Sequence, residues 1–311
     1  MNITLRQLEY LKALVQHRNF RRAAETCHVS QPALSVQIKA LEQAFGGPLV
    51  ERLSRDVIPT PLGRRVLDVA GRMLADLAEL DQIARSGQGG GGTLTLGVIP
   101  TIAPYFLPDA LAALRARDIA LDVQVTESKT ARLARMLGEG TLDVAVMALP
   151  VEADRLTAVP LFEDRFLLAG SAARLAQIGR SDPLTPDRLN LRHLMLLEDG
   201  HCLTDQALEV CGQGRGHPQI NMGASSLSTL SRLVAAGFGV TLMPELAALS
   251  EAQAAPDMRL CRFSTPEPAR VIGLFRRDTG PQPEWFGDLQ ALLTGVGEKL
   301  VQKARDDLSQ G

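Results

Sequence analysis

Hydrophobic residues recur at every third or fourth position through the N-terminal part of the chain, and this spacing predicts amphipathic helices. Helices are predicted over residues 4–17, 20–26 and 31–45. Ser30 is the expected N-cap of the third helix, which tolerates a proline in its first turn. Helices joined by a tight turn, the second with a polar face, are typical of a helix-turn-helix. The residues of the third helix expected to contact double-stranded DNA are Ser30, Gln31, Pro32, Ser35, Gln37 and Lys39.

A predicted hairpin follows over residues 49–60 and has the form of a wing. Arg52 and Arg55 lie on it, where their guanidinium groups can contact phosphates. Residues 1–72 carry eleven basic and six acidic side chains, whereas the rest of the chain carries 22 and 29. A basic module ahead of an acidic one indicates that only the first part meets a polyanion. The alternative is a three-helix bundle with a solvated basic face.

A long helix is predicted to begin at Thr60-Pro61 and to end at a glycine-rich hinge over residues 86–92. A seam of apolar residues on a connecting helix needs a partner helix, so it predicts a dimer. The seam has an average spacing of about 3.5 residues, the period of a coiled coil. Its positions are Leu62, Val66, Val69, Met73, Leu77, Leu80 and Ile83.

From Thr93 onward, strands and helices alternate, which predicts parallel βαβ units. A second α/β set is expected between about residues 164 and 263. A strand over residues 270–275 and a final helix from about residue 283 are expected to return to the first set. Two lobes linked by two crossings leave a cleft between them, where ligands usually bind.

The fold class is therefore multidomain α/β, with three segments in chain order. Residues 1–60 are the expected winged helix-turn-helix DNA-binding domain, and residues 61–92 are the linker helix that forms the dimer. Residues 93–311 are the expected effector domain of two lobes. Lobe I is predicted at about 93–163 and 267–311, and lobe II at about 164–266.

Two cysteines, Cys202 and Cys211, lie in a segment whose apolar residues repeat with a helical period. Asp199 is the predicted N-cap of this helix. Nine residues of helix advance about 13.5 Å and leave two side chains about half a turn out of phase. A disulfide needs Cα atoms about 4.4–6.8 Å apart. The two thiols cannot form a disulfide while the helix is intact. The pattern therefore predicts a redox switch in which the helix unwinds.

The position of Cys202 suits attack on a peroxide. It lies in the first turn of its helix, where the macrodipole and free amides favour the thiolate that peroxide oxidises. His201 is adjacent, and Arg270 is the candidate cation. Oxidation gives a sulfenic acid, with which Cys211 can condense as the resolving cysteine.

The amino-acid composition limits the class of protein, its location and its cofactors. The chain has 311 residues, is 45% hydrophobic and carries a formal net charge of −2, as expected for an α/β protein of several domains. No apolar run is long enough for a membrane span and no signal peptide is evident, so a cytoplasmic location is expected. Four cysteines do not make a disulfide framework, and Cys27 and Cys261 are interpreted as core residues. No metal or cofactor is expected, because no nucleotide fingerprint occurs and three histidines lack ligand spacing with any cysteine: His28, His193 and His217.

Several short motifs point to one family. The first 65 or so residues contain LRQLEYL at 5–11, Ala23-Ala24, SQPALS at 30–35 and TPLG at 60–63. In these motifs the chain resembles the LysR-type transcriptional regulators. Four further stretches resemble the branch of that family that senses hydrogen peroxide, namely IPT at 99–101, PYFLP at 104–108, LLEDGHCL at 196–203 and TLMP at 241–244.

The resemblance implies an effector domain like that of periplasmic binding proteins, a dimer of dimers, and control of transcription through RNA polymerase at a DNA operator. It also implies a peroxide site in the cleft. Relatives often carry an arginine two residues past the first cysteine, where this chain has Thr204, so the positive charge is expected from another residue. The residues expected to support the peroxide site are Thr101, Thr130, His201, Asp205 and Arg270.

The sequence leaves three candidate functions for this chain. The first is a regulator switched by a disulfide between Cys202 and Cys211, and the second is a LysR-type regulator gated by an ordinary small ligand, with inert cysteines. The third is a thiol peroxidase, which would have no use for a helix-turn-helix. The sequence therefore predicts a regulator and not an enzyme.

Overall fold

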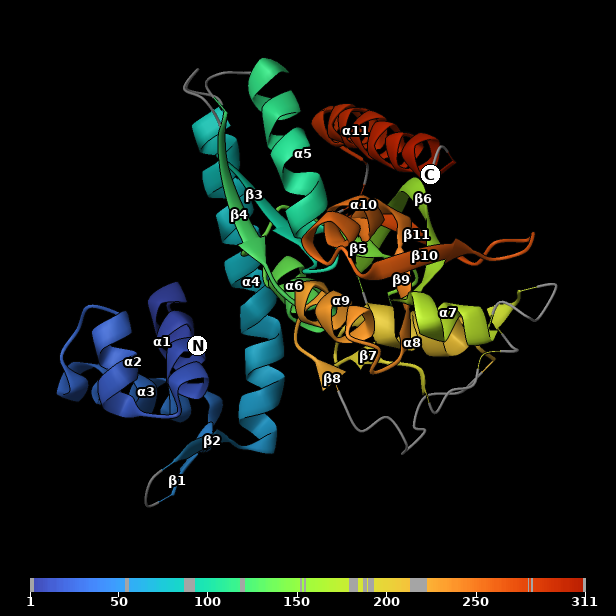
Figure 1. Ribbon diagram of the computed structural model, residues 1–311. Helices are drawn as coiled ribbons and strands as arrows, with labels where there is room; N and C mark the ends of the chain where they lie inside the picture. The colour runs from blue at the N-terminus through green and yellow to red at the C-terminus, as the bar shows by residue number, and fades with distance from the viewer. Residues whose placement is uncertain are drawn as a thin grey trace. The chain divides into compact units, whose positions relative to one another are not determined.

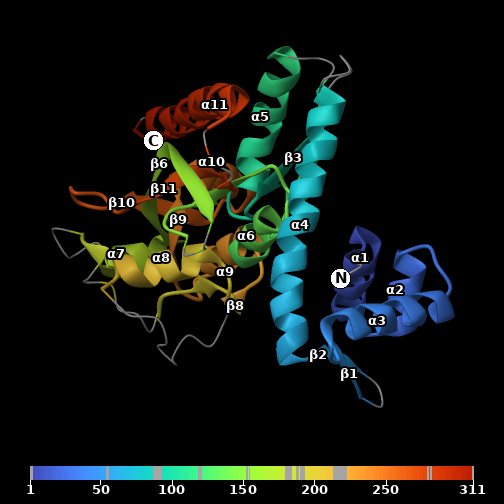
Figure 2. The ribbon, with the colours of Figure 1, turned by 180° about the vertical axis from the view of Figure 1, so that it is seen from behind.

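The computed structural model divides into two compact units, an N-terminal unit that extends through helix α4 and an effector unit from strand β3 onward (Figures 1 and 2). Arg55, His217 and the hinge at 87–92 lie outside the residues that the structure describes. The described residues are 3–53, 56–86, 93–117, 121–151, 153, 155–178, 184–186, 189, 193–212, 223–278, 280 and 282–309.

The N-terminal unit confirms the predicted helices and wing. Its elements are α1 (Leu5–His17), α2 (Phe20–Thr26), α3 (Gln31–Phe45), β1 (Val50–Arg52), β2 (Val57–Pro59) and α4 (Pro61–Ser86). Ser30 caps α3 by accepting a hydrogen bond from the amide of Ala33, as predicted. Strands β1 and β2 pair in antiparallel register. Leucines and isoleucines of α1 and α3 form the core, and five of them are fully buried: Leu11, Leu14, Leu34, Ile38 and Leu41.

Helix α4 begins where the sequence predicts, because the Thr60 hydroxyl accepts a hydrogen bond from the amide of Gly63 at 2.9 Å. Its apolar seam divides into two parts. Val66 is buried in the core of the N-terminal unit, so it is not available to a partner helix. Val69 and Met73, one and two turns further on, are 47% and 49% exposed in the single chain. Val69 and Met73 are therefore open to a second helix, and the side chains of Leu80 and Ile83 lie outside the described part of the chain.

The sheet of lobe I in the effector unit is mixed, with parallel strands beside β11, which pairs antiparallel with β5. Strand β3 pairs in parallel with β4 and with β5, and helices α5 and α11 pack against each other beside the sheet (Figure 1). The bounds are β3 (Thr93–Val98), α5 (Ala103–Arg117), β4 (Asp122–Glu127), α6 (Thr130–Gly138), β5 (Val144–Ala148), β11 (Ala269–Arg277) and α11 (Glu284–Ser309).

Lobe II has its own hydrophobic core. Its elements are α7 (Ala172–Ile178), β7 (Leu196–Leu197), α8 (Cys202–Val210), β8 (Gly223–Ala224), α9 (Leu227–Ala235), β9 (Val240–Pro244), α10 (Glu245–Ala254) and β10 (Met258–Arg262). Strands β9 and β10 both pair antiparallel with β6 (Leu156–Ser171), because that strand enters from lobe I in the opposite direction.

Strand β6 connects the two lobes. Its first part pairs with β11, and its second part pairs with β9 and β10. Phe162 belongs to the lobe I core and Phe166 to the lobe II core. The returning chain crosses at the same place, where the Phe166 amide donates to the Pro268 carbonyl at 2.8 Å. The two lobes thus share one strand and meet at a hydrogen-bonded double crossing.

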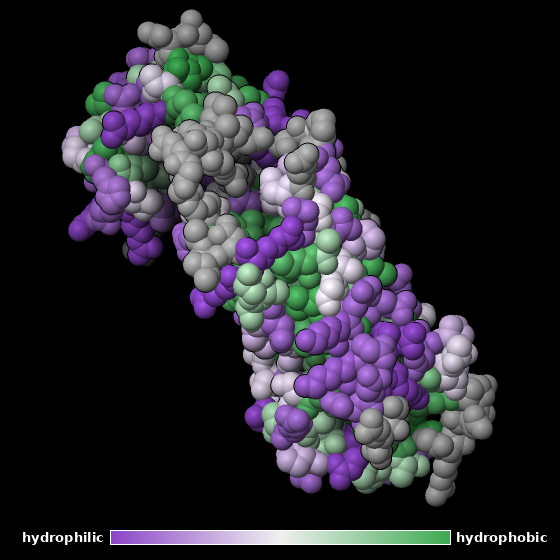
Figure 3. Space-filling model, turned by 90° about the horizontal axis from the view of Figure 1, so that it is seen from above, coloured by the Kyte–Doolittle hydropathy of each residue, from purple (hydrophilic) through white to green (hydrophobic). Residues whose placement is uncertain are grey.

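The surface is mainly polar on the face drawn in Figure 3, with smaller hydrophobic areas among hydrophilic residues. Among the described residues, none of the helices combines the length and the hydropathy that a membrane crossing requires.

Candidate functional site

Helix α8 carries the two cysteines at its ends. Cys202 is its first residue and Cys211 is its C-cap, and no disulfide joins them. The predicted cap is wrong: the N-cap is His201, whose side chain makes no capping hydrogen bond. Gly200, at φ +90°, turns the chain immediately before α8, which leaves Asp199 outside the cap position. The predicted separation of the two thiols along an intact helix is confirmed.

The two ends of α8 pack against different hydrophobic cores. Cys202 is half-buried against the core of lobe I, whereas Cys211 is 4% exposed within the core of lobe II. The Gln206 side chain donates to the Leu149 carbonyl of lobe I at 3.2 Å. The Thr204 hydroxyl donates to the Leu197 carbonyl at 2.9 Å. Thr204 therefore fastens α8 to strand β7.

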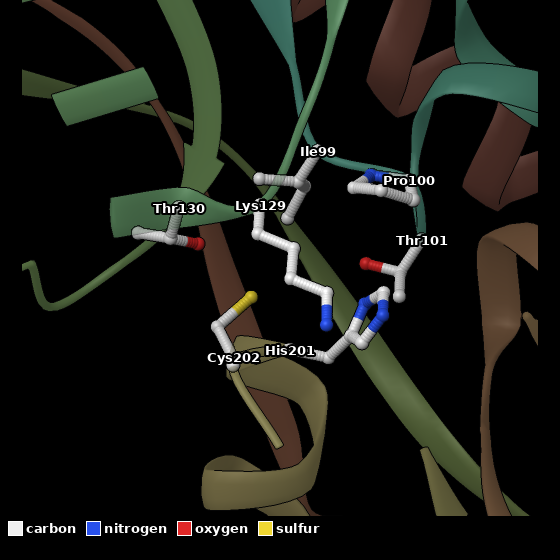
Figure 4. Close-up of a pocket in the computed structure, with 8 residues that line it drawn as sticks. Ile99, Pro100, Thr101, Lys129, Thr130, His201 and Cys202 are labelled. Atoms are coloured by element: carbon white, nitrogen blue, oxygen red, sulfur yellow. The ribbon is translucent and has the colours of Figure 1, made fainter. Parts of the chain in front are cut away.

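A small hollow lies at the first turn of α8, between the end of β3 and the start of α6 (Figure 4). It encloses about 150 Å³, including space open to solvent. In Figure 4 the Cys202 sulfur, the Thr130 hydroxyl and the Lys129 ammonium point into it. The lining residues are Ile99, Pro100, Thr101, Lys129, Thr130, Gly200, His201 and Cys202. The structure thus brings together four residues expected at a peroxide site, from segments about 30 to 100 residues apart in the chain.

Two polar atoms of this hollow lack hydrogen-bond partners among the described residues, although His201 Nε2 lies 4.0 Å from Glu198 Oε1. These atoms, Thr130 Oγ1 and His201 Nε2, are both buried. Buried polar atoms are nearly always satisfied, so two unsatisfied ones beside a thiol indicate a place for a small molecule that donates and accepts hydrogen bonds. Hydrogen peroxide has that chemistry.

The charge in the hollow comes from Lys129, which the sequence analysis missed. Its ammonium donates to Glu198 Oε1 at 2.8 Å and to the Asp199 carbonyl at 2.9 Å. Burial lowers the pKa of His201, the Lys129 charge lowers it further, and Glu198 opposes both effects. His201 is therefore a neutral imidazole at neutral pH. Lys129 is the immediate neighbour of Thr130, and that adjacency was the only signal in the sequence.

Arg270 does not supply the charge as expected. Its guanidinium is buried and binds Asp164 Oδ2 through Nε and Nη2, at 2.9 and 2.8 Å. The same group donates through Nη1 to Thr101 Oγ1 at 3.0 Å. Its positive charge is compensated by a buried carboxylate, and its role is to orient Thr101. Asp205 lies exposed on the first turn of α8 and is not among the lining residues.

The predicted DNA-contacting residues divide into exposed and occupied side chains. Gln31, Pro32 and Lys39 are exposed on α3, beside the Ser30 cap. Gln37 accepts a hydrogen bond from Gln7 Nε2 at 3.0 Å, which links α3 to α1, and its contact with base edges stays a prediction.

One residue of the wing and one further residue of α3 bear on DNA contact. Arg52 lies 4.3 Å above the Phe20 ring and donates to the Ser35 hydroxyl at 3.5 Å, which orients it beside α3. Val36, 63% exposed, was missed, because an apolar residue gives no hydrogen-bonding signal. A valine on that surface has the chemistry to contact a thymine methyl group.

Comparison with known proteins identifies the class. Residues 5–64 match the bacterial regulatory helix-turn-helix protein, lysR family, and residues 87–296 match the LysR substrate binding domain. The chain therefore belongs to the LysR family of bacterial regulators.

Within the family, the similar proteins are peroxide regulators. The DNA-binding transcriptional dual regulator OxyR of Escherichia coli (strain K12) is 38% identical over 307 residues, which cover 97% of this chain and 100% of that protein. A hydrogen peroxide-inducible genes activator of Dickeya chrysanthemi is 39% identical, covering 98% of this chain and 96% of its own.

Solved structures of peroxide regulators are also similar to this chain. A full-length OxyR mutant from Pseudomonas aeruginosa superposes with a TM-score of 0.71 at 31% identity, covering 94% of this chain and 95% of that one. An H2O2-bound OxyR mutant from Corynebacterium glutamicum gives a TM-score of 0.62 at 32% identity, covering 99% and 96%.

Proposed function

We propose that this protein is a peroxide-sensing transcriptional regulator in which Cys202 is the peroxidatic and Cys211 the resolving cysteine. One observation carries the proposal. Cys202 faces a hollow with two unsatisfied buried polar atoms, Thr130 Oγ1 and His201 Nε2, while Cys211 lies at the other end of the same helix. The relatives named for hydrogen peroxide support the same conclusion.

The chemistry balances without a cofactor. The Cys202 thiolate attacks one oxygen of hydrogen peroxide, the O–O bond breaks, and hydroxide leaves as the sulfur becomes a sulfenic acid. The Cys211 thiol then attacks that sulfur, and water leaves as the disulfide forms. Two electrons pass from the two thiols to peroxide. Because α8 holds the thiols apart, the second step requires the helix to unwind.

The groups that line the hollow suit hydrogen peroxide. Thr101, Thr130 and His201 supply hydrogen-bonding groups for a small molecule that both donates and accepts.

The output of the switch is a change in DNA binding. We propose that the protein acts on a double-stranded operator as a dimer of dimers, controls oxidative-stress genes through RNA polymerase, and does so in the cytoplasm. The exposed polar face of α3 and the oriented Arg52 support DNA contact, and the exposed Val69 and Met73 support pairing of α4. The chain is a stoichiometric sensor, so we infer that it is not an enzyme.

Counting thiols tests the proposal. The reduced protein has four cysteines, and one equivalent of peroxide should leave two, with mass spectrometry locating the disulfide between Cys202 and Cys211. Cys202→Ser should abolish both this loss and the change in DNA binding. Cys261→Ser is the matched control and should leave both intact. A Cys202→Ser protein that still responds to peroxide would contradict the proposed function, and multiple turnovers with a thiol reductant at enzymatic rates would favour a peroxidase.

A further inference from the structure

One ion pair remains as the source of positive charge near the Cys202 sulfur. Arg270 reaches the hollow only through Thr101, and its charge is compensated by Asp164. His201 is neutral at neutral pH, because burial and Lys129 lower its pKa. Among the described lining residues, Lys129 is the cation.

The position of Lys129 is fixed from two directions. Its ammonium binds the Glu198 carboxylate at 2.8 Å and the Asp199 carbonyl at 2.9 Å, both in the segment that leads into α8. Its stem lies against Gly200, where an added Cβ would come within 3.3 Å of Lys129 Cδ. Lys129, His201 and Cys202 line the same hollow, and in Figure 4 the Lys129 ammonium points into it. The Lys129 and Glu198 side chains are 37% and 49% exposed, so the pair is partly screened by water.

We propose that the Lys129–Glu198 ion pair sets the reactivity of Cys202. The Lys129 ammonium stabilises the thiolate, and Glu198 holds the ammonium in place while offsetting part of its charge. This assignment rests on the proposed function, because it concerns the cysteine that peroxide attacks. Lys129 is a positioning residue that acts through its charge and makes no bond to peroxide.

The other charged groups near Cys202 are accounted for. In the preceding segment and on its own helix, the charged or titratable groups are Glu198, Asp199, His201 and Asp205. From lobe I the charged groups are Lys129 itself and the paired Arg270. The field of Lys129 extends into the hollow, since the same ammonium contributes to lowering the pKa of His201.

Two substitutions separate an electrostatic role from a purely structural one. Lys129→Met keeps the length of the stem and removes the positive charge, whereas Glu198→Gln keeps an acceptor for the ammonium and removes the negative charge. Both break the same ion pair. If the pair served only to hold the chain, the two variants would change Cys202 in the same direction. If its charge matters, they must change Cys202 in opposite directions.

The measurement is site-resolved alkylation of Cys202 in the reduced full-length protein, followed by mass spectrometry from about pH 5 to pH 9. We expect Lys129→Met to slow the alkylation of Cys202 at neutral pH by about threefold or more, and Glu198→Gln to accelerate it. Lys129→Arg, which retains the charge, should stay close to the unmodified protein. Added salt should shrink both shifts, because the pair is partly exposed.

Oxidation by peroxide at neutral pH should follow the same order, with Lys129→Met slower by about threefold or more and Glu198→Gln faster. Shifts of equal sign in the two charge-removing variants, or no shift in either, would overturn the inference even if Cys202 still forms its disulfide. Opposite shifts in alkylation, together with a Cys202 that peroxide does not oxidise, would instead overturn the proposed function.

Discussion

Cys202 and Cys211 occupy the two ends of one helix and pack against the hydrophobic cores of two different lobes. Bringing their sulfurs together therefore requires more than a rotamer change. The helix hydrogen bonds of α8 must break, and Cys211, 4% exposed, must leave the lobe II core. These costs oppose the disulfide, so it should be strained and readily reduced.

The resolving step can be isolated by removing Cys211. In Cys211→Ser, peroxide should still oxidise Cys202, but the sulfenic acid should persist, because no second thiol condenses with it. A sulfenic-acid probe such as dimedone should label Cys202 in this variant and much less in the unmodified protein. A Cys27→Ser control should behave like the unmodified protein. Equal labelling of Cys211→Ser and the unmodified chain would refute the resolving role.

Contacts to phosphate and to bases should differ in their salt dependence. Arg52→Ala should weaken binding to specific and random DNA alike and reduce the slope of affinity against salt by about one, because one phosphate contact releases about one counterion. Gln31→Ala should instead relax preference at one base position per half-site, by about 1–3 kcal/mol. Fluorescence anisotropy over a range of salt concentrations distinguishes the two. An equal loss on every DNA from both variants would show that the assigned roles are wrong.

The open part of the α4 seam should hold the dimer. Met73→Glu places a charge at a position that is 49% exposed in the single chain and buried in a helix pair, so it should dissociate the pair. Leu77→Glu, one turn further on, should act in the same way. Arg72→Glu, next to the seam on the exposed side, is the matched control. Light scattering checks the mass, and full oligomer size in Met73→Glu would remove the coiled-coil interpretation.

The buried pair of Asp164 and Arg270 should be costly to break from one side only. Arg270→Met leaves the fully buried carboxylate without its cation, and we expect a loss of about 3–5 kcal/mol in the free energy of unfolding. The double variant with Asp164→Asn should lose less than the sum of the two single changes, because it removes the uncompensated charge. Urea denaturation of all three proteins measures the coupling. Strict additivity would contradict it.

Acid should destabilise the reduced effector unit through His201. Burial lowers the pKa of this side chain in the folded protein, so below about pH 6.5 the unfolded chain binds the proton first. Stability should therefore be full above about pH 6.5 and should fall as the pH drops toward the lower folded value. His201→Gln should flatten this part of the curve of unfolding free energy against pH. An unchanged slope in the variant would exclude His201 as its source.

The sequence predicted what depends on local spacing. The helices of the N-terminal unit, the Ser30 cap and the separation of the two cysteines follow from a period of 3.6 residues and from capping chemistry, both of which are visible in one stretch of chain. The left-handed turn at Gly200, which moves the cap from Asp199 to His201, is local as well, but glycine permits many conformations and does not announce which one it takes.

What the sequence did not predict depends on contacts between distant segments. Lys129 meets Glu198 across 69 positions, and Arg270 meets Asp164 across 106. A single sequence identifies each of these as a charged residue but not its partner, so the cation of the site was assigned to Arg270. The hydrogen bond between Gln37 and Gln7 was not predicted for the same reason, since Gln7 lies 30 positions away on another helix.

The span of α8 between two cores also determines how the signal is kept in time. A regulator gated by a reversible ligand tracks the present concentration of that ligand, because occupancy falls as soon as the ligand departs. Under the proposed chemistry the peroxide is consumed. The segment of α8 that unwinds on oxidation then keeps its oxidised conformation until a reductant cleaves the sulfur–sulfur bond. The fraction of molecules in the oxidised form thus records how much oxidant has arrived since the last reduction. The lifetime of the oxidised form is set by the supply of cellular thiols. Reduction of the disulfide is favoured because it allows helix α8 to form again.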